Sequence, residues 1–383
     1  MGYLRTYLAL CVVAAHSTFL VPWQMHTGQQ AVQIFFIISG FYMAMILSGK
    51  YKSTKRFYIS RWLRIFGPYY MILIAIVLGS IVWGLLSRNF LTLNSYVSNP
   101  LAHNGLAGIL FVAITNLTLF GQDWVMFLTH DIGQRFAFTS NFGTSKSPLW
   151  KYLVIPQCWS IGIEETFYLA VPFINRLKTR WLVALLAASL AARLITYRSG
   201  YHSDPWTHRF FPFEAGLFLM GILGLRLYSK LNLDEFPKCR RYIYFVPVFI
   251  VVLAIHAKAI EFLGKQIGIE YAILISYPFW AIVIVFLFAY FREHKVDRFI
   301  GELCYPIYLI HYTVALAVAS FLGRPSGRAT ALIVLVLAAL FFVFVLKPYE
   351  AWRHWLTGAR SNEQLPMSSV PVVKTSPVSL VET

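Results

Sequence analysis

Eleven apolar runs follow one another along this chain, and most of them are about 18 residues or longer. A run of that length crosses the ~30 Å hydrocarbon core of a bilayer as one helix. Charged residues make up 13% of the chain, about half of their share in a soluble domain. The sequence therefore predicts an all-α, polytopic membrane protein. The runs lie at residues 4–21, 31–48, 66–86, 105–120, 158–175, 181–199, 208–228, 242–257, 271–291, 300–322 and 329–348.

The basic residues cluster in short linkers between the runs, and such linkers are expected on the cytoplasmic side. All of these linkers fall on the same side of the membrane only if one run between residues 66 and 158 does not cross it. The run at 105–120 is the weakest, so it is expected to be re-entrant or interfacial. The prediction is about ten transmembrane helices with both termini cytoplasmic and a long outer excursion over residues 87–157. The basic linkers are 50–56, 176–180, 226–241, 292–298 and 347–360.

The same charge pattern limits the partners and the domains. The net charge of +17 is explained by topology, so no nucleic-acid partner is expected. The four cysteines have no metal-type spacing, and we expect neither a metal site nor a structural disulfide. The first 20 residues lack the basic start and the cleavage site of a signal peptide. Residues 1–350 are predicted to form one membrane domain, and residues 351–383 a cytoplasmic, largely disordered tail.

Ionisable side chains inside apolar runs are costly in lipid and point to function. Arg5 and His16 are eleven residues apart, which places them on one helix face with a rise of roughly 16 Å. Arg5 would then lie near the cytoplasmic interface and His16 near the middle of the membrane. The spacing leaves two interpretations open for each residue. His16 is either a reactive group or a hydrogen-bonding residue between helices, and Arg5 either a ligand contact or an interfacial anchor.

Two further groups have a functional and a structural interpretation. Glu164 lies about 8 Å into the run that starts at Trp159, with Tyr168 on the same face, and its carboxylate either pairs with a cation or orients a catalytic group. Arg61 and Arg64 share a face at the cytoplasmic mouth, where paired guanidinium groups either set the topology or bind phosphate.

Other polar residues in the runs are consistent with packing or hydrogen bonding. His311 lies near the middle of its run with Tyr308 beside it, and Glu214 is a further buried acid.

Five stretches of the chain carry recognisable motifs. They are an Arg and a His separated by ten residues (Arg5, His16), Phe-Phe-x-x-Ser-Gly-aromatic (residues 35–41, with Ser39 and Gly40), Arg-x-x-Arg (Arg61, Arg64), Trp-Ser-x-x-x-Glu-Glu-x-Phe-Tyr (residues 159–168) and a late-helix motif (residues 301–311). Together, and in this order, they resemble the acyltransferase 3 family of membrane-bound acyltransferases. One departure is Ile161, where the family has Leu.

The resemblance implies an O-acyltransferase that uses acyl-coenzyme A, usually acetyl-coenzyme A, as a co-substrate, with no permanently bound cofactor. The acceptor is expected to be a carbohydrate hydroxyl of an exopolysaccharide, an O-antigen or a lipid-linked glycan. The expected location is the cytoplasmic (inner) membrane of a bacterium. Acceptor handling is expected within the membrane domain or by a partner.

The motifs also suggest roles for single residues. Arg61 and Arg64 would bind the phosphates of acyl-coenzyme A, with Arg5 along the path, and Ser39 and Gly40 would approach the thioester. His16 would be the general base, or carry an acyl-histidine intermediate, and Glu164 would orient His16 or the acceptor. Trp159 would stack on a sugar. The remaining acceptor-binding or supporting residues are Tyr168, Tyr308, His311 and Glu214.

Two other classes of protein fit the same residues. A transporter or flippase for a glycan or small molecule would use His16, Glu164, Glu214 and His311 as a proton path. Such proteins often have internal repeats, and we find none in this sequence. A structural partner in a glycan-export complex is the second alternative.

Overall fold

The computed structural model describes residues 1–49, 53–98, 105–130, 136–145, 148–237 and 242–357. Eight helices in this part of the chain are long and apolar enough to span a membrane, which confirms the all-α, polytopic prediction. Two of them have a break or an irregular turn within their length. The eight are α2 (Gly28–Gly49), α3 (Thr54–Ser87), α8 (Thr179–Arg198), α9 (Phe211–Lys230), α10 (Tyr242–Ile267), α11 (Ile269–Phe291), α12 with α13 (Lys295–Glu302 and Cys304–Leu322), and α14 with a π-turn and α15 (Gly327–Phe341, Phe342–Leu346 and Lys347–Thr357).

The other three predicted runs form shorter helices. These are α1 (Gly2–Ala15), α5 (Gly105–Thr118) and α7 (Trp159–Ile174). The run predicted at 4–21 ends early, because α1 stops at Ala15 and residues 16–27 form a loop. The smaller elements are α4 (Asn94–Ser98), α6 (Gln122–Val125), β1 (Leu128–His130), β2 (Phe136–Phe138), and 3₁₀ turns at Leu91–Leu93, Leu149–Tyr152, Pro156–Cys158 and Leu233–Glu235.

Helix α2 is the most buried of the eight spans and lies between α1 on one side and α9 on the other. Its contact with α9 depends on two glycines. A Cβ atom on Gly40 would lie 2.0 Å from the carbonyl oxygen of Phe218, and one on Gly221 would lie 2.1 Å from that of Ile37. Gly40 is therefore a packing residue that lets α2 and α9 touch, and not the thioester contact that we predicted.

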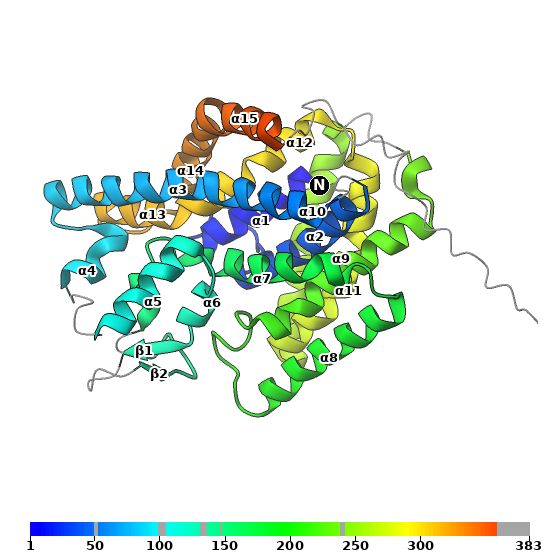
Figure 1. Ribbon diagram of the computed structural model, residues 1–383, viewed down its shortest axis with the longest axis horizontal. Helices are drawn as coiled ribbons and strands as arrows, with labels where there is room; N and C mark the ends of the chain where they lie inside the picture. Colours follow the sequence, from blue (N-terminus) through cyan, green and yellow to red (C-terminus); the bar gives the residue numbers. More distant parts are fainter. Residues whose placement is uncertain (50–52, 99–104, 131–135, 146–147, 238–241, 358–383) are drawn as a thin grey trace, which may run out of the picture.

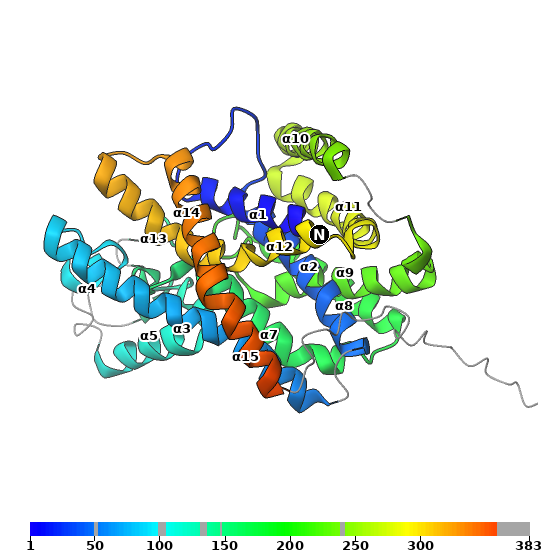
Figure 2. The ribbon, with the colours of Figure 1, turned by 90° about the horizontal axis from the view of Figure 1, so that it is seen from above.

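The remaining helices surround this centre. Helix α8 packs on α9, and α10 packs at the edge of the molecule against α11 (Figure 2). Helices α3 and α13 run side by side (Figure 1), and α15 crosses α3, where Arg353 donates a hydrogen bond to Ser60. Helix α3 begins at Thr54, earlier than the predicted run, so Arg61 and Arg64 lie within its first turns and not in the linker.

The basic linkers gather on one side of the bundle. Arg226 donates hydrogen bonds to the carbonyl groups of Asn175 and Leu177, which joins the linkers 226–241 and 176–180. Arg292 pairs with Asp234, which joins a third linker, 292–298, to 226–241. This arrangement agrees with the predicted alternation of the spans, and the identity of this side as cytoplasmic stays a prediction. Residues 50–52 and 238–241 of the linkers lie outside the described residues. Residues 351–357 of the predicted tail belong to α15, and the rest of the tail also lies outside them.

Helix α5, predicted to be re-entrant or interfacial, is one of the shorter apolar helices, and its path relative to the membrane stays a prediction. It has 14 residues, and its C-terminal end meets the middle of α3, where Tyr69 and Tyr70 donate hydrogen bonds to the carbonyl groups of Asn116 and Leu117. The chain then turns at Gly121, which has a φ of +79°, a left-handed conformation that favours glycine. The two 3₁₀ turns after the hairpin lead directly into α7.

Candidate active site

A pocket of about 430 Å³ lies between α1, α2, α3, α7 and α13. Arg292, Asp297 and Arg298 form part of its wall, so the pocket reaches the side on which the basic linkers gather. It brings together seven of the twelve predicted site residues, which come from five helices. They are Arg5, Ser39, Arg61, Arg64, Glu164, Tyr168 and Tyr308.

Three arginines converge on this pocket. Arg5 comes from α1, and its guanidinium makes no hydrogen bond or ion pair with any described residue, although Glu164 and Glu302 are near enough to act on it electrostatically. Arg61 comes from α3 and is 8% exposed. Arg64, one turn later, pairs with Glu302 at 3.3 Å. The pocket therefore combines a concentrated positive charge with an acidic side chain that already neutralises part of it.

The inner wall carries a short chain of hydroxyl groups. The hydroxyl of Tyr168 donates a hydrogen bond of 2.9 Å to Oε2 of Glu164 and lies 3.0 Å from the hydroxyl of Ser39. Because Tyr168 gives its proton to the carboxylate, Ser39 is the donor to Tyr168. A second pair, Ser160 and Tyr308, is joined at 2.6 Å. Glu164 thus orients Tyr168 and Ser39 at the pocket wall, and it contributes a negative charge close to Arg5 and Arg61.

His16 occupies a different position from the one that we expected. It caps the C-terminus of α1 and is exposed, and it does not belong to the pocket lining. Its ring centroid lies 5.2 Å from that of His311 and 5.3 Å from that of Tyr312, both on α13. Among the described residues His16 and Glu164 make no direct contact with each other, and α13, whose Tyr308 lines the pocket, lies beside both. Of the two predicted roles of Glu164, orienting His16 or the acceptor, the second stays a prediction.

Trp159 supports an arginine and is not an open stacking surface. The Arg209 guanidinium lies 4.3 Å from the Trp159 ring centroid and 5.1 Å from that of Phe142. Arg209 also pairs with Asp204 at 2.5 Å. With 6% of Trp159 exposed, the ring has no free face for a sugar, which corrects our prediction. The sequence did not reveal the covering group, because Arg209 lies 50 residues away.

The loop before α9 holds this arginine by electrostatics. The pKa of Asp204 is below its ordinary value, because His208 and Arg209 outweigh the opposing effect of burial. Burial is the main reason why the pKa of His208 falls to about 4, while Asp204 acts in the opposite direction. Near neutral pH the loop therefore contains a carboxylate, a guanidinium and a neutral imidazole.

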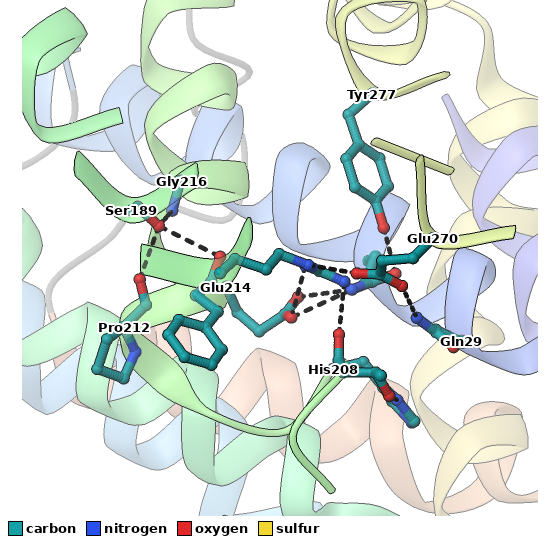
Figure 3. A network of polar contacts seen from close by, with 12 residues as sticks. Gln29, Ser189, His208, Pro212, Glu214, Gly216, Glu270 and Tyr277 are labelled. Carbon is teal, nitrogen blue, oxygen red and sulfur yellow. Dashed lines mark hydrogen bonds and ion pairs between the residues drawn. The ribbon is translucent and has the colours of Figure 1, made fainter. Parts of the chain in front are cut away.

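Glu214 belongs to a separate buried network and not to the pocket (Figure 3). Its carboxylate accepts hydrogen bonds of 3.1 Å from Gln33 and of 3.0 Å from Arg193. Arg193 also pairs with Glu270 at 2.6 Å, and Tyr277 donates to Gln33. We had treated the run at 181–199 as apolar. Arg193 and Glu214 inside two apolar runs, with Glu270 directly before a third, are the signal that points to such a network.

The described residues contain no group of three or more His, Cys, Asp or Glu side chains that could hold a metal ion. Cys11, Cys158 and Cys304 are free thiols, and Cys239 lies outside the described residues. The polar groups gathered in the pocket are guanidinium, hydroxyl and carboxylate groups, which suit an anionic, polar ligand.

Residues 1–347 match the family model described as an acyltransferase domain, that of the acyltransferase 3 family. No curated protein and no solved structure matches the chain. The match covers the five motifs and the pocket. Eight helices in the described part of the chain are long and apolar enough to span a membrane. The chain therefore belongs to the acyltransferase 3 family and is an integral membrane acyltransferase.

Proposed function

We propose that the protein transfers an acyl group, usually acetyl, from acyl-coenzyme A to a carbohydrate hydroxyl of an exopolysaccharide, an O-antigen or a lipid-linked glycan. The location would be the inner membrane of a bacterium. The observation that carries this proposal is the pocket in which Arg5, Arg61 and Arg64 face the hydroxyl groups of Ser39 and Tyr168. Coenzyme A is a polyanion, and guanidinium groups bind phosphate with paired hydrogen bonds.

The donor would enter from the side of the basic linkers. Arg61 and Arg64, in the first turns of α3, would bind its phosphates, and Arg64 would exchange Glu302 for a phosphate oxygen. The pantetheine arm would then follow the pocket inward past Arg5, which is half-buried and whose guanidinium has no hydrogen-bond partner among the described residues. A partly buried cation of this kind gains from an anionic or strongly polar ligand.

The chemical step needs a base for the acceptor hydroxyl and a donor for the thioester oxygen. His16 would take the proton of the acceptor hydroxyl, whose oxygen attacks the thioester carbon. The carbon–sulfur bond then breaks, and the imidazolium of His16 returns the proton to the coenzyme A thiolate. Ser39 would donate its single proton to the carbonyl oxygen as negative charge develops there, and would turn that proton away from Tyr168 to do so. In the absence of the donor, the hydroxyl of Ser39 lies at the pocket wall against Tyr168, which Glu164 orients.

The two substrates would meet beside α13. Tyr308 belongs to the pocket wall, and the ring of His311 lies 5.7 Å from that of Tyr308 and 5.2 Å from that of His16. One turn of α13 therefore contacts both the pocket and the proposed base. Because the acceptor oxygen must contact the thioester carbon, the thioester end of the donor would have to pass the side chains of this turn to reach the acceptor beside His16.

A proton-coupled transporter is less well supported. Its proton path would need Glu214 to continue from Glu164, but Glu214 hydrogen-bonds Gln33 and Arg193 in a separate network. Glu164 instead interacts with Tyr168.

The direct test uses the purified protein in lipid nanodiscs with [¹⁴C]acetyl-coenzyme A and surface glycans extracted from a strain in which the gene is deleted. We expect labelled glycan and an equal amount of free coenzyme A. The His16→Ala variant should lose this activity while keeping normal abundance, and Arg61→Ala combined with Arg64→Ala should raise the KM for acetyl-coenzyme A. Labelled glycan from His16→Ala would remove His16 from the mechanism, and a protein that only carries substrates would release no coenzyme A.

A further inference from the structure

Two imidazole rings, of His16 and His311, lie side by side where the C-terminus of α1 meets α13. His16 is exposed, whereas His311 is 1% exposed. The imidazole of His16 makes no hydrogen bond with any described residue, and its aromatic contacts are His311 and Tyr312. The exposed ring thus lies against one face of α13.

The proton position on His311 follows from its surroundings. Its Nδ1 lies 2.7 Å from the carbonyl oxygen of Tyr308. A carbonyl oxygen only accepts, so Nδ1 carries the proton, and in the neutral ring Nε2 is then an acceptor. This Nε2 is buried and has no hydrogen-bond partner among the described residues. A buried acceptor without a partner is costly and calls for an explanation.

A second histidine pair in the same protein shows how far apart two imidazole rings lie when their nitrogens are hydrogen-bonded. His26 and His256 are joined by a hydrogen bond of 2.9 Å between ring nitrogens, and their ring centroids lie 5.1 Å apart. The centroids of His16 and His311 lie 5.2 Å apart. The two pairs therefore have the same separation. The ring planes of His16 and His311 differ more than those of the other pair, by 40° against 25°. The centroid separation of His16 and His311 is therefore compatible with a hydrogen bond from an N–H of His16 to Nε2 of His311.

We propose that His311 is a positioning residue for His16, whose N–H it accepts so that the other ring nitrogen of His16 is presented, unprotonated, to the acceptor alcohol. The role of His16 as base belongs to the proposed function, on which this inference rests. The arrangement is a chain in which the Tyr308 carbonyl fixes the His311 tautomer and His311 fixes that of His16. In enzymes with a Ser-His-Asp triad, a carboxylate orients the catalytic histidine. Here the neutral imidazole of His311 would take the place of that carboxylate.

Two substitutions separate this role from a purely structural one. In His311→Gln the side-chain oxygen takes the place of Nε2, so the acceptor for His16 is kept while the bond to Tyr308 is lost. In His311→Asn the amide group takes the place of Nδ1, so the bond to Tyr308 is kept while the acceptor for His16 is lost. A positioning role and a structural role therefore predict opposite rankings of the two variants.

The measurement follows His16 itself and does not depend on the acceptor glycan. Diethylpyrocarbonate modifies unprotonated imidazole, and mass spectrometry of the peptide that contains His16 gives the modification rate at each pH in the purified full-length protein. The groups that face His16 are His311 and Tyr312 on α13 and Arg209 in the loop before α9. Of these, only His311 differs between the variants.

We expect the midpoint of the His16 modification curve to move to lower pH by about one unit in His311→Asn, because the imidazolium loses a hydrogen-bond acceptor. In His311→Gln the midpoint should stay near that of the wild type. His256→Asn is the matched control, since it removes an imidazole from the other pair, and it should leave the curve unchanged. In the transfer assay, kcat should fall about 100-fold in His311→Asn and less than 10-fold in His311→Gln, with the KM for acetyl-coenzyme A unchanged.

The inference is overturned if both variants keep the wild-type midpoint, or if His311→Gln shifts it and His311→Asn does not. Both results are obtained without turnover. If the protein does not transfer acetyl groups, the proposed function is refuted. The modification rate of His16 would still show whether His311 accepts a hydrogen bond from it.

Discussion

Nη1 of Arg193 lies 3.0 Å from Oε1 of Glu214, and both side chains are almost completely excluded from solvent. The same guanidinium also pairs with Glu270. Helices α8, α9 and α11 therefore contribute one charged side chain each to a single cluster (Figure 3). Buried charges are tolerated only when they are paired and hydrogen-bonded. The cluster therefore specifies how α8, α9 and α11 pack, where apolar surfaces alone would allow several arrangements.

Replacing Arg193 by Met should destabilise the protein by about 3–5 kcal/mol, because Glu214 and Glu270 are left as uncompensated buried carboxylates. The measurement is thermal unfolding in detergent. Arg198→Met is the matched control, since Arg198 is exposed on the same helix and should change stability by less than about 0.5 kcal/mol. Adding Glu214→Gln and Glu270→Gln to Arg193→Met should recover part of the loss. Equal melting temperatures for Arg193→Met and Arg198→Met would contradict the proposed role of the cluster.

Glu302 competes with the donor for Arg64. The two side chains pair at 3.3 Å and are both about one-third exposed, so the ion pair is weak, on the order of 0.2–1 kcal/mol. Glu302→Gln should lower the KM for acetyl-coenzyme A by about twofold to fivefold, because a phosphate no longer has to displace a carboxylate. Steady-state kinetics with the purified enzyme provide the measurement.

Glu261→Gln is the control for Glu302→Gln. It removes the same charge from an exposed pair with Lys265 on α10, far from the pocket lining, and should leave the KM unchanged. A higher KM in Glu302→Gln would mean that Glu302 holds Arg64 in its binding position and does not compete with the ligand.

The path of α5 makes a prediction about topology. If α5 does not cross the membrane, as we predict, Ser98 before it and Thr144 after it should lie on the same side. Lys178 and Lys295, in the basic linkers, should lie on the opposite side. Single-cysteine variants at these four exposed positions, in a chain with its native cysteines replaced, should react with a membrane-impermeant maleimide in two matching pairs. Reaction of Ser98→Cys and Thr144→Cys from opposite sides would mean that α5 crosses.

How much of this structure was predictable depends on how far apart in sequence the interacting groups lie. Apolar length identified the helices, because it is a local property, and motif spacing brought Arg5, Ser39 and Glu164 to one pocket. The errors concern pairs that no local pattern reveals. Trp159 is covered by Arg209, Gly40 touches Phe218 on another helix, and the partner of Glu214 lies in a run that we treated as apolar.

His208 predicts how stability depends on pH. The imidazole is 8% exposed, and burial lowers its pKa from the ordinary value of 6.5 to about 4. Between these two values the unfolded chain binds a proton at this position and the folded chain does not, so stability rises with pH across the interval. A drop from pH 7 to pH 4 should cost about 3 kcal/mol from this residue. Asp204, whose pKa is lowered, keeps its contribution above pH 4 and loses it only in stronger acid.

The test compares thermal unfolding of the wild type and of His208→Gln at several pH values between 4 and 7.5. Gln has no proton to gain in this range, so the melting temperature of the variant should fall less steeply with acid than that of the wild type. The two curves should be parallel above pH 7 and converge toward pH 4. Curves that stay parallel through the whole interval would mean that His208 takes up its proton in the folded protein as readily as in the unfolded chain, and hence that the loop before α9 opens to water before the helices separate.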